Sequence, residues 1–217
     1  MLSRVPHRRR PEVVDELRRL VAQSVATETR PLPFGLPALD AHLPQGGLTC
    51  GALHEVAPDT PDDMPAAFGF VAALLGRMPP SGPVLLVTAP RALAAHGRPY
   101  GHGLNGLGLD PARVILVETA DAKQALWAME EALRSAVPAA VAGAVDKLDF
   151  RASQRLHLAA GDSGRPLLLL RPGGMTSVAA TRWRVAAAAA AHDRFGLVAR
   201  WRWRVTLERC RNGRPGQ

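Results

Sequence analysis

Residues 53–70, LHEVAPDTPDDMPAAFGF, place three carboxylates and three prolines in a turn between a predicted strand and a predicted helix. Such a turn binds a phosphate when it offers glycine amides, a lysine and a hydroxyl. Proline has no N–H to donate, and a carboxylate ~4 Å from a phosphate repels it by about 1 kcal/mol in water and about 4 kcal/mol at an effective dielectric constant of 20. We therefore expect no nucleotide at the residues of this turn: Pro58, Asp59, Pro61, Asp62, Asp63, Met64 and Pro65.

The other residues that could do chemistry lack partners of the right type and spacing. His54 and Glu55 are adjacent on a predicted strand, so their side chains point to opposite faces and form no dyad. Glu118 ends a predicted strand, where sites of α/β proteins gather, and we interpret it as structural. The seven histidines show no metal-ligand spacing, and Cys50 and Cys210 have no CxxC partner. The cysteine pattern favours a reduced, cytoplasmic protein without a metal or a disulfide framework.

These residues must be positioned by an alternation of strands and helices. Apolar runs bounded by turn residues predict strands that are covered on both faces, over residues 52–56, 84–88, 113–117, 139–145 and 166–170. Helical periodicity predicts a short helix around Leu39 and helices over 66–77, 122–137 and 151–161, the second of these opened by a capping box from Asp121 to Gln124. The glycine-rich residues 100–110 are interpreted as a loop. The alternation is typical of an α/β fold with a mostly parallel sheet, and two later β-segments joined through HDRFG predict an antiparallel addition at one edge.

The chain has 217 residues, of which 47% are hydrophobic, enough for a buried core. No apolar run reaches the ~20 residues of a membrane span, and the N-terminus lacks the apolar segment of a secretory signal. We divide the chain into an N-terminal helix and linker over 1–30, a core over 31–209 and a basic, flexible tail over 210–217. Within the first part, residues 11–26 predict an amphipathic docking helix.

The basic charge of the chain is concentrated near its C-terminus. The net charge is +8, and it divides into +3 for residues 1–30, −5 for residues 31–150 and +10 for residues 151–217. This distribution is typical of a protein that binds nucleic acid or an acidic protein. A GC-rich genome also produces a bias toward Arg, Ala, Gly and Pro without any ligand, so DNA contact stays open.

The segment RWRWRVTLER, residues 200–209, alternates between two faces. Trp201, Trp203, Val205 and Leu207 share the face that we expect to pack, and the opposite face presents a row of arginines. A solvated edge strand that resists aggregation would show the same pattern. The candidate contacts to a partner or to DNA are Arg18, Arg19, Arg182, Arg184, Arg200, Arg202, Arg204, Arg209 and Arg211.

The segment GLPALDAHLPQGGLTCGALHEV, residues 35–56, resembles the opening of the RecA recombinase core. The matching positions are Gly35, Leu39, Asp40, Leu43, Gly46, Gly47, Leu48, Gly51 and Glu55. Later segments, including LDPARVILVE, RLHLAA, LLLLRP, ATRWRV and RCRNGRPG, are similar to the ImuA-type group, RecA-like proteins of bacterial SOS mutagenesis. The resemblance covers roughly residues 30–214 and implies a RecA-like core.

The resemblance also implies that the catalytic positions of that core are lost. The glycines, lysine and threonine of the phosphate loop fall within residues 58–65, the glutamate that activates water falls on Pro90, and the magnesium-orienting aspartate falls on Gly143. Asp146 would take the last role only if the register shifted by a few residues, and otherwise we interpret it as a helix cap. We expect no enzymatic activity and no cofactor.

By the same resemblance, the protein acts as a scaffold in DNA-damage-induced mutagenic translesion synthesis. The implied partners are RecA, an inactive polymerase homologue of the ImuB type and an error-prone DNA polymerase, with DNA contacted through the complex. Two alternatives remain: a cell-division inhibitor like SulA, and an ATPase of the RecA or RadA type. The destroyed phosphate loop argues against the ATPase.

Overall fold

The computed structural model describes residues 31–79, 81–172 and 176–211. The predicted helix over 11–26, with Arg18 and Arg19, lies outside the described residues, as does the predicted tail beyond Arg211. Among the described residues, no helix is long and apolar enough to cross a membrane.

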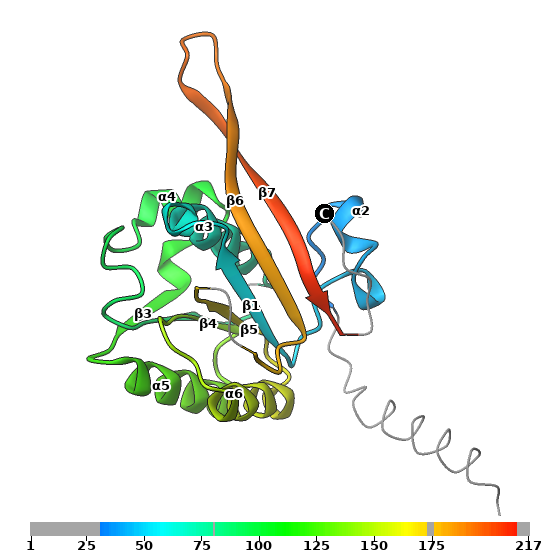
Figure 1. Ribbon diagram of the computed structural model, residues 1–217, viewed down its shortest axis with the longest axis vertical. Coiled ribbons are helices and arrows are strands. Elements are labelled where there is room, and N and C mark those ends of the chain that lie inside the picture. Colours follow the sequence, from blue (N-terminus) through cyan, green and yellow to red (C-terminus); the bar gives the residue numbers. More distant parts are fainter. Residues whose placement is uncertain (1–30, 80, 173–175, 212–217) are drawn as a thin grey trace, which may run out of the picture.

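The centre of the fold is one seven-stranded sheet with the strand order β3-β2-β4-β5-β1-β6-β7 (Figure 1). The strands are β1 (Leu53–Pro58), β2 (Val84–Thr88), β3 (Val114–Glu118), β4 (Ala140–Ala144), β5 (Leu167–Leu170), β6 (Thr181–His192) and β7 (Val198–Cys210). Neighbours from β3 to β6 pair in parallel, and β7 pairs antiparallel with β6. The α/β fold and its antiparallel edge are confirmed, and β7 extends through Cys210, one residue past the expected end of the core.

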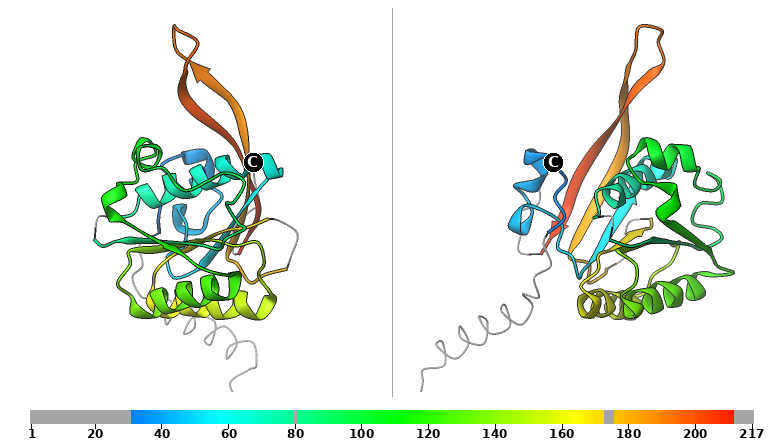
Figure 2. Two further views of the ribbon diagram at one scale, coloured as in Figure 1. Left: turned by 90° about the vertical axis from the view of Figure 1, so that its left-hand side faces the viewer. Right: turned by 180° about the vertical axis from the view of Figure 1, so that it is seen from behind.

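Helices cover both faces of the sheet. The described residues form the helices α2 (Pro37–Asp40), α3 (Met64–Gly76), α4 (Gly101–Gly106), α5 (Ala122–Ser135) and α6 (Phe150–Ser163), with 3-10 turns η1 (Pro44–Gly46), η2 (Pro61–Asp63) and η3 (Pro111–Arg113). Helix α3 packs on one face, and α5 with α6 covers the other (Figures 1 and 2). Because both faces are covered, alternate residues such as Leu168 and Leu169 in β5 are buried in different cores.

Two local predictions were wrong. The glycine-rich residues 100–110 include a helix, α4, whose Leu104 is buried. The cap of α6 is Asp149, which accepts a hydrogen bond of 2.7 Å from the backbone N–H of Ala152, and not Asp146. The predicted cap of α5 is confirmed, because Asp121 accepts from the N–H of Gln124.

The motif residue Asp40 has a structural role. Its carboxylate accepts hydrogen bonds from the N–H groups of Phe34, at 2.7 Å, and of Leu36, at 3.1 Å. The bend that results places the Phe34 ring 5.0 Å from the ring of Trp183 and 5.7 Å from that of Phe70. An aromatic cluster therefore joins the first described segment, α3 and β6.

Strands β6 and β7 form a long hairpin whose outer end projects from the body of the molecule (Figures 1 and 2). Strand β1 accompanies β6 only as far as the pair Pro58 and Val185. Beyond that point β6 pairs with β7 alone, through register shifts near Ala188 and Ala191.

Candidate interaction site at the projecting hairpin

The turn between β1 and α3 fastens the hairpin through Asp63. One carboxylate oxygen of Asp63 accepts a hydrogen bond of 2.8 Å from the backbone N–H of Ala187, just beyond the last pair of β1 with β6. The other oxygen accepts from the N–H and hydroxyl of Thr60, at 3.1 and 2.7 Å. The bond from Ala187, followed by those from Thr60, holds the pKa of Asp63 below its ordinary value.

Asp59 makes a second set of contacts to the hairpin. Its backbone N–H donates to the carbonyl of Val185 at 2.9 Å, and its carboxylate lies 3.3 Å from the guanidinium of Arg204 and 3.9 Å from that of Arg184. Arg184 also pairs with Glu208 on β7. The acidic turn predicted from the sequence therefore binds arginines and an amide of its own chain.

The other two positions that the resemblance assigned to catalysis hold residues without a carboxylate. Gly143 lies within β4, and a Cβ atom added there would come within 2.1 Å of the Met129 sulfur and 3.4 Å of a Leu169 methyl group. A side chain at position 143 would therefore require the Met129 side chain to shift. Pro90 follows β2 and is exposed, and Asp146 lies two residues after β4.

Glu118, at the end of β3, has a partner that the sequence did not suggest. The guanidinium of Arg98 binds both of its carboxylate oxygens, with Nε at 2.8 Å from one of them. Arg98 belongs to the segment between β2 and α4, and both side chains of the pair are exposed.

A buried ion cluster joins β1, β5 and β6. Glu55 is 2% exposed and accepts from Arg171 at 3.0 and 3.2 Å and from Arg182 at 3.0 and 3.1 Å. Arg182 also donates to the hydroxyl of Ser177. Arg182, a predicted partner contact, is thus bound by a buried carboxylate of its own chain, which needs such pairing because it is out of water.

His54 points to the opposite face from its neighbour Glu55, as predicted. The hydroxyl of Thr181 accepts from the indole N–H of Trp183 at 2.7 Å and lies 2.8 Å from Nδ1 of His54. Nε2 of the ring lies 2.8 Å from the carbonyl of Thr49, so it carries the proton and donates. Burial lowers the pKa of His54 to about 4, and the charge of His157 adds to this effect against the raising effect of the bond to Thr49.

The apolar face of β7 packs over only part of its length. Leu207 is buried, and Val205 and Trp203 pack against the core beside α3, as the alternation predicted. Gly69 of α3 makes room for the indole, because an added Cβ would come within 3.1 Å of Trp203 Cζ2. Trp201 was wrongly expected to pack: its side chain is 71% exposed, since it lies on the outer part of the hairpin.

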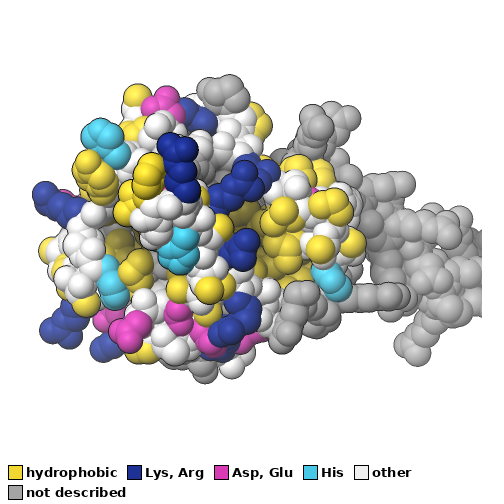
Figure 3. Space-filling model, turned by 90° about the horizontal axis from the view of Figure 1, so that it is seen from above, with side chains coloured by type: hydrophobic (Ala, Val, Ile, Leu, Met, Phe, Trp, Pro, Cys, Tyr) yellow, Lys and Arg dark blue, Asp and Glu magenta, His cyan; other side chains and the backbone are white. Residues whose placement is uncertain are grey.

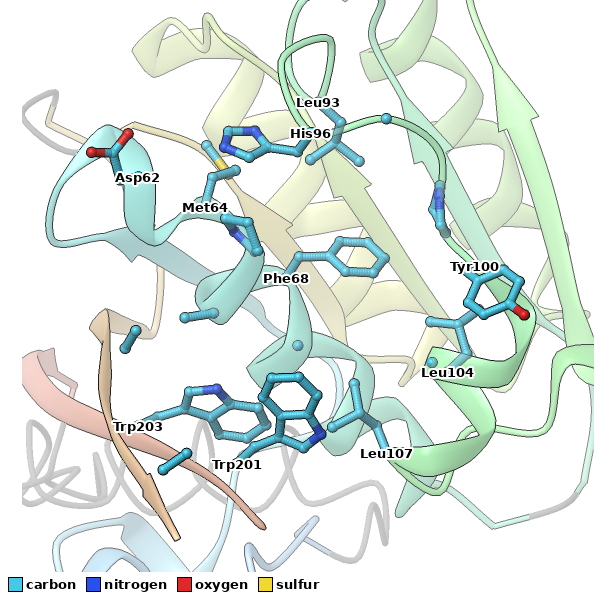
Figure 4. Close-up of a pocket in the computed structure, with 18 of the residues that line it drawn as sticks. Asp62, Met64, Phe68, Leu93, His96, Tyr100, Leu104, Leu107, Trp201 and Trp203 are labelled. Atoms are coloured by element: carbon cyan, nitrogen blue, oxygen red, sulfur yellow. The ribbon is translucent and has the colours of Figure 1, made fainter. Parts of the chain in front are cut away.

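Trp201 and Trp203 instead form one wall of a groove of about 490 Å³. The other walls are the N-terminal half of α3 and the segment 93–107, and Figure 4 shows Phe68 between the two tryptophans and Tyr100. The aliphatic lining is supplied by Met64, Leu93, Leu104 and Leu107. We refer to this cavity as the hairpin groove.

No protein-family model matches the chain. Protein ImuA of Caulobacter vibrioides, in strains NA1000 and CB 15, is 36% identical over 208 residues, which is 88% of this chain and 82% of the relative. This chain belongs to the ImuA family. Membership confirms the resemblance to the ImuA-type group and associates the chain with SOS mutagenesis. A solved structure, SulA from Pseudomonas aeruginosa, has 23% identity and a TM-score of 0.43, and the match covers 55% of this chain and 98% of that one.

In this ImuA-family protein the seven predicted contact arginines that the structure describes fall into two groups. Five contact their own chain: Arg182, Arg184, Arg204, Arg209 and Arg211. Arg209 donates to the Ser177 carbonyl at 2.9 Å, and the Arg211 guanidinium lies 3.4 Å from His157. Arg200 and Arg202 are exposed, and within the part of the chain that the structure describes neither has an acidic partner. The two lie on the outer part of the hairpin.

Sequence reasoning missed the hairpin groove, because its aromatic residues come from three segments far apart in the ImuA-family chain. Phe68 belongs to a helix, Tyr100 to a segment interpreted as a loop, and Trp201 and Trp203 to the last strand. The sequence did contain one signal, the pair of tryptophans in an alternating edge strand. An edge strand that faces only solvent does not require large aromatic side chains.

Proposed function

We propose that this ImuA-family protein is a non-catalytic accessory protein of SOS mutagenic translesion synthesis that acts through protein partners. One observation supports it best: the carboxylates of the β1–α3 turn are bound by the hairpin of the same chain, with Asp63 on the Ala187 N–H and Asp59 beside Arg204 and Arg184. A phosphate would have to displace these contacts and then face the carboxylates that they neutralise.

Three further features favour a RecA-like core that has lost its nucleotide. The motif over 35–56 leads into β1, and β1 leads through a short turn into α3, which is the order in which a phosphate loop is built. Prolines occupy three positions of the turn and donate no N–H. The position of the magnesium aspartate holds Gly143, which carries no carboxylate, and the Met129 side chain packs against it.

Under this proposal the partners are RecA, a polymerase homologue of the ImuB type and an error-prone DNA polymerase, in the cytoplasm. The projecting hairpin supplies accessible surface for such contacts, and Arg200 and Arg202 are exposed basic side chains of it that have no acidic partner among the described residues. DNA is reached through the complex.

Calorimetry tests the absence of catalysis. We expect no saturable heat when ATP and Mg²⁺ are added to the full chain, and a micromolar Kd would contradict the proposal. The Asp62→Ala variant is the matched control, since Asp62 is an exposed carboxylate of the same turn, and its removal is expected to leave ATP binding absent.

Complementation tests the cellular role. In a host that lacks this gene, the wild-type chain is expected to restore DNA-damage-induced mutation, and Asp162→Ala, which removes an exposed carboxylate of α6, is expected to restore it equally. Failure of the wild type to restore mutation, together with cell filamentation when the chain is overproduced, would contradict the proposal and favour a cell-division inhibitor.

A further inference from the structure

We propose that the hairpin groove is a docking site for an acidic protein segment that inserts large apolar side chains. The inference rests on the proposed function, because it assigns one surface of the molecule to the protein partners. The groove joins the outer hairpin, the first turns of α3 and the segment 93–107 into one concave surface.

The groove exposes more aromatic surface than an isolated protein needs. Trp201 is 71% exposed and Tyr100 is 68% exposed, and both line the cavity together with the partly buried Phe68 and Trp203. A contiguous apolar surface of this kind, surrounded by polar groups, marks an interaction site. Tryptophan, tyrosine and arginine are also the residues that dominate the binding energy of protein interfaces.

Small residues keep the groove open on the hairpin side. Ala187 and Ala190 of β6 line it, and Ala187 is the cross-strand neighbour of Trp203, so the two share a face. The cavity of about 490 Å³ falls within the range of ~300–1,000 Å³ that is typical of binding sites. The alanine run of β6 thus leaves space that a larger residue would fill.

The charges around the groove favour an acidic occupant. Arg202 on the hairpin and Arg98 on the opposite wall line it, together with His96, and Asp62 is the one acidic residue of the lining. Arg98 is shared with Glu118, whereas Arg202 has no ion-pair partner among the described residues. Figure 3 views the molecule from the end at which the hairpin projects, and it shows basic side chains lying between apolar ones on this face. Complementary charge on a partner would guide its approach and its orientation.

The lining favours a peptide over single-stranded DNA. Sites for single strands combine a basic track with aromatic planes on which successive bases stack. Here the aromatic residues converge on a cavity whose remaining walls are aliphatic, from Met64, Leu93, Leu104 and Leu107.

Selection from a phage-displayed library of random peptides of roughly 16 residues, long enough for a short helix or strand to fill a groove, tests the proposal on the full chain. We expect enriched peptides to carry net negative charge and two or more large apolar residues. Their affinity is expected to fall at least about tenfold for Trp201→Ala, which removes a wall, as for the loss of a central aromatic contact.

Two further variants separate loss of the groove from loss of the fold. Ala187→Phe fills the groove and should weaken binding by a similar factor. The fold is expected to tolerate this change, because the side chain at position 187 is exposed. Phe195→Ala removes an equally exposed aromatic, 70% exposed at the tip of the hairpin and outside the groove lining, and should leave binding unchanged.

Three outcomes would overturn the proposal: no enrichment over background, enriched peptides that bind Trp201→Ala as well as the wild type, or enriched peptides that are basic. A fourth is tight binding of oligo-dT that Trp201→Ala and Ala187→Phe both abolish, which would make the groove a nucleic-acid site. ATP binding by calorimetry would contradict the proposed function while leaving this peptide selection unaffected, so the two failures are distinguishable.

Discussion

In the half of the hairpin next to β1, Trp183 is fully buried and Leu207 is 2% exposed, whereas in the outer half Trp201 is 71% and Leu197 is 66% exposed. In β7 the alternation of apolar and polar residues runs from Arg200 in the outer half to Glu208 in the inner half, and both halves are antiparallel pairs of β6 with β7. The inner half is covered by α3 and by Phe34, and the outer half has only its own second strand. Two strands alone bury little surface, so the same alternation yields core in one half and accessible surface in the other.

The charged residues differ in the same way. In the inner half, Arg182 is bound by the buried Glu55, and Arg184 by Glu208. In the outer half, Arg200 and Arg202 of β7 have no acidic partner among the residues that the structure describes. Residues of the inner half should therefore control stability, and residues of the outer half should control binding.

Replacing one tryptophan in each half gives the largest expected contrast. Trp183→Ala should lower the free energy of unfolding by about 3–5 kcal/mol, because it leaves a cavity against Phe34 and Phe70. Trp201→Ala should change it by less than about 0.5 kcal/mol. Urea denaturation of both variants measures the difference, and equal losses would mean that the outer half is part of the cooperative core.

Acid should weaken the inner half through His54. Its folded pKa of about 4 lies below the ordinary 6.5, so the unfolded chain binds the proton more tightly. The neutral ring's contribution is complete above pH 6.5 and is lost as the pH falls toward 4, by as much as about 3 kcal/mol at 1.36 kcal/mol per pKa unit.

The test of this prediction is the pH dependence of urea unfolding for the wild type and for His54→Gln. We expect the variant to lose less stability than the wild type between pH 6.5 and pH 4. The carboxylates and His157 titrate in both proteins, so the difference between the two curves isolates His54. Parallel curves would show that the ring is protonated at little cost.

The junction between the halves should respond more weakly. Asp63→Ala removes the acceptor of the Ala187 and Thr60 N–H groups and should cost about 1 kcal/mol, as the loss of a capping side chain does. Asp62→Ala, next to it in the same turn, should cost less than about 0.5 kcal/mol, since Asp62 makes no hydrogen bond to a described residue. Hydrogen exchange at the Ala187 amide reports the local effect, and unchanged protection in Asp63→Ala would contradict it.

The sequence predicted the sheet well because burial on both faces leaves a strong pattern. Runs such as LLLL in β5 match the observed strand, and Asp121 was identified correctly as a helix cap. The turn at 58–65 was also located correctly, because prolines and aspartates define it without reference to the rest of the chain. These features depend on neighbours in sequence.

Features that depend on distant partners could not be predicted. Nothing local indicates that Asp63 binds the amide of Ala187, 124 residues away, or that Arg182 is enclosed by Glu55. Alternation showed which face of β7 Trp201 occupies, but it did not show that Trp201 would remain exposed beside a groove instead of packing against α3. The hairpin groove arises from such distant contacts, so the sequence alone did not indicate it.

The smallest effect on stability is expected for the arginines of the outer half. Changing Arg200, Arg202 and Arg204 together to Ser should alter the free energy of unfolding by less than about 0.5 kcal/mol, because exposed residues contribute little and the pair of Arg204 with Asp59 is largely solvated. Binding to the mutagenesis partners should weaken in the same variant. A salt titration then distinguishes the ligand, because phosphate contacts lose affinity linearly in the logarithm of salt concentration, with a slope set by the number of contacts. Unfolding of the triple variant would show that these side chains support the fold. A folded variant that binds every partner normally would leave the arginines as a solvated edge and assign partner binding to the hairpin groove or to residues outside the described chain.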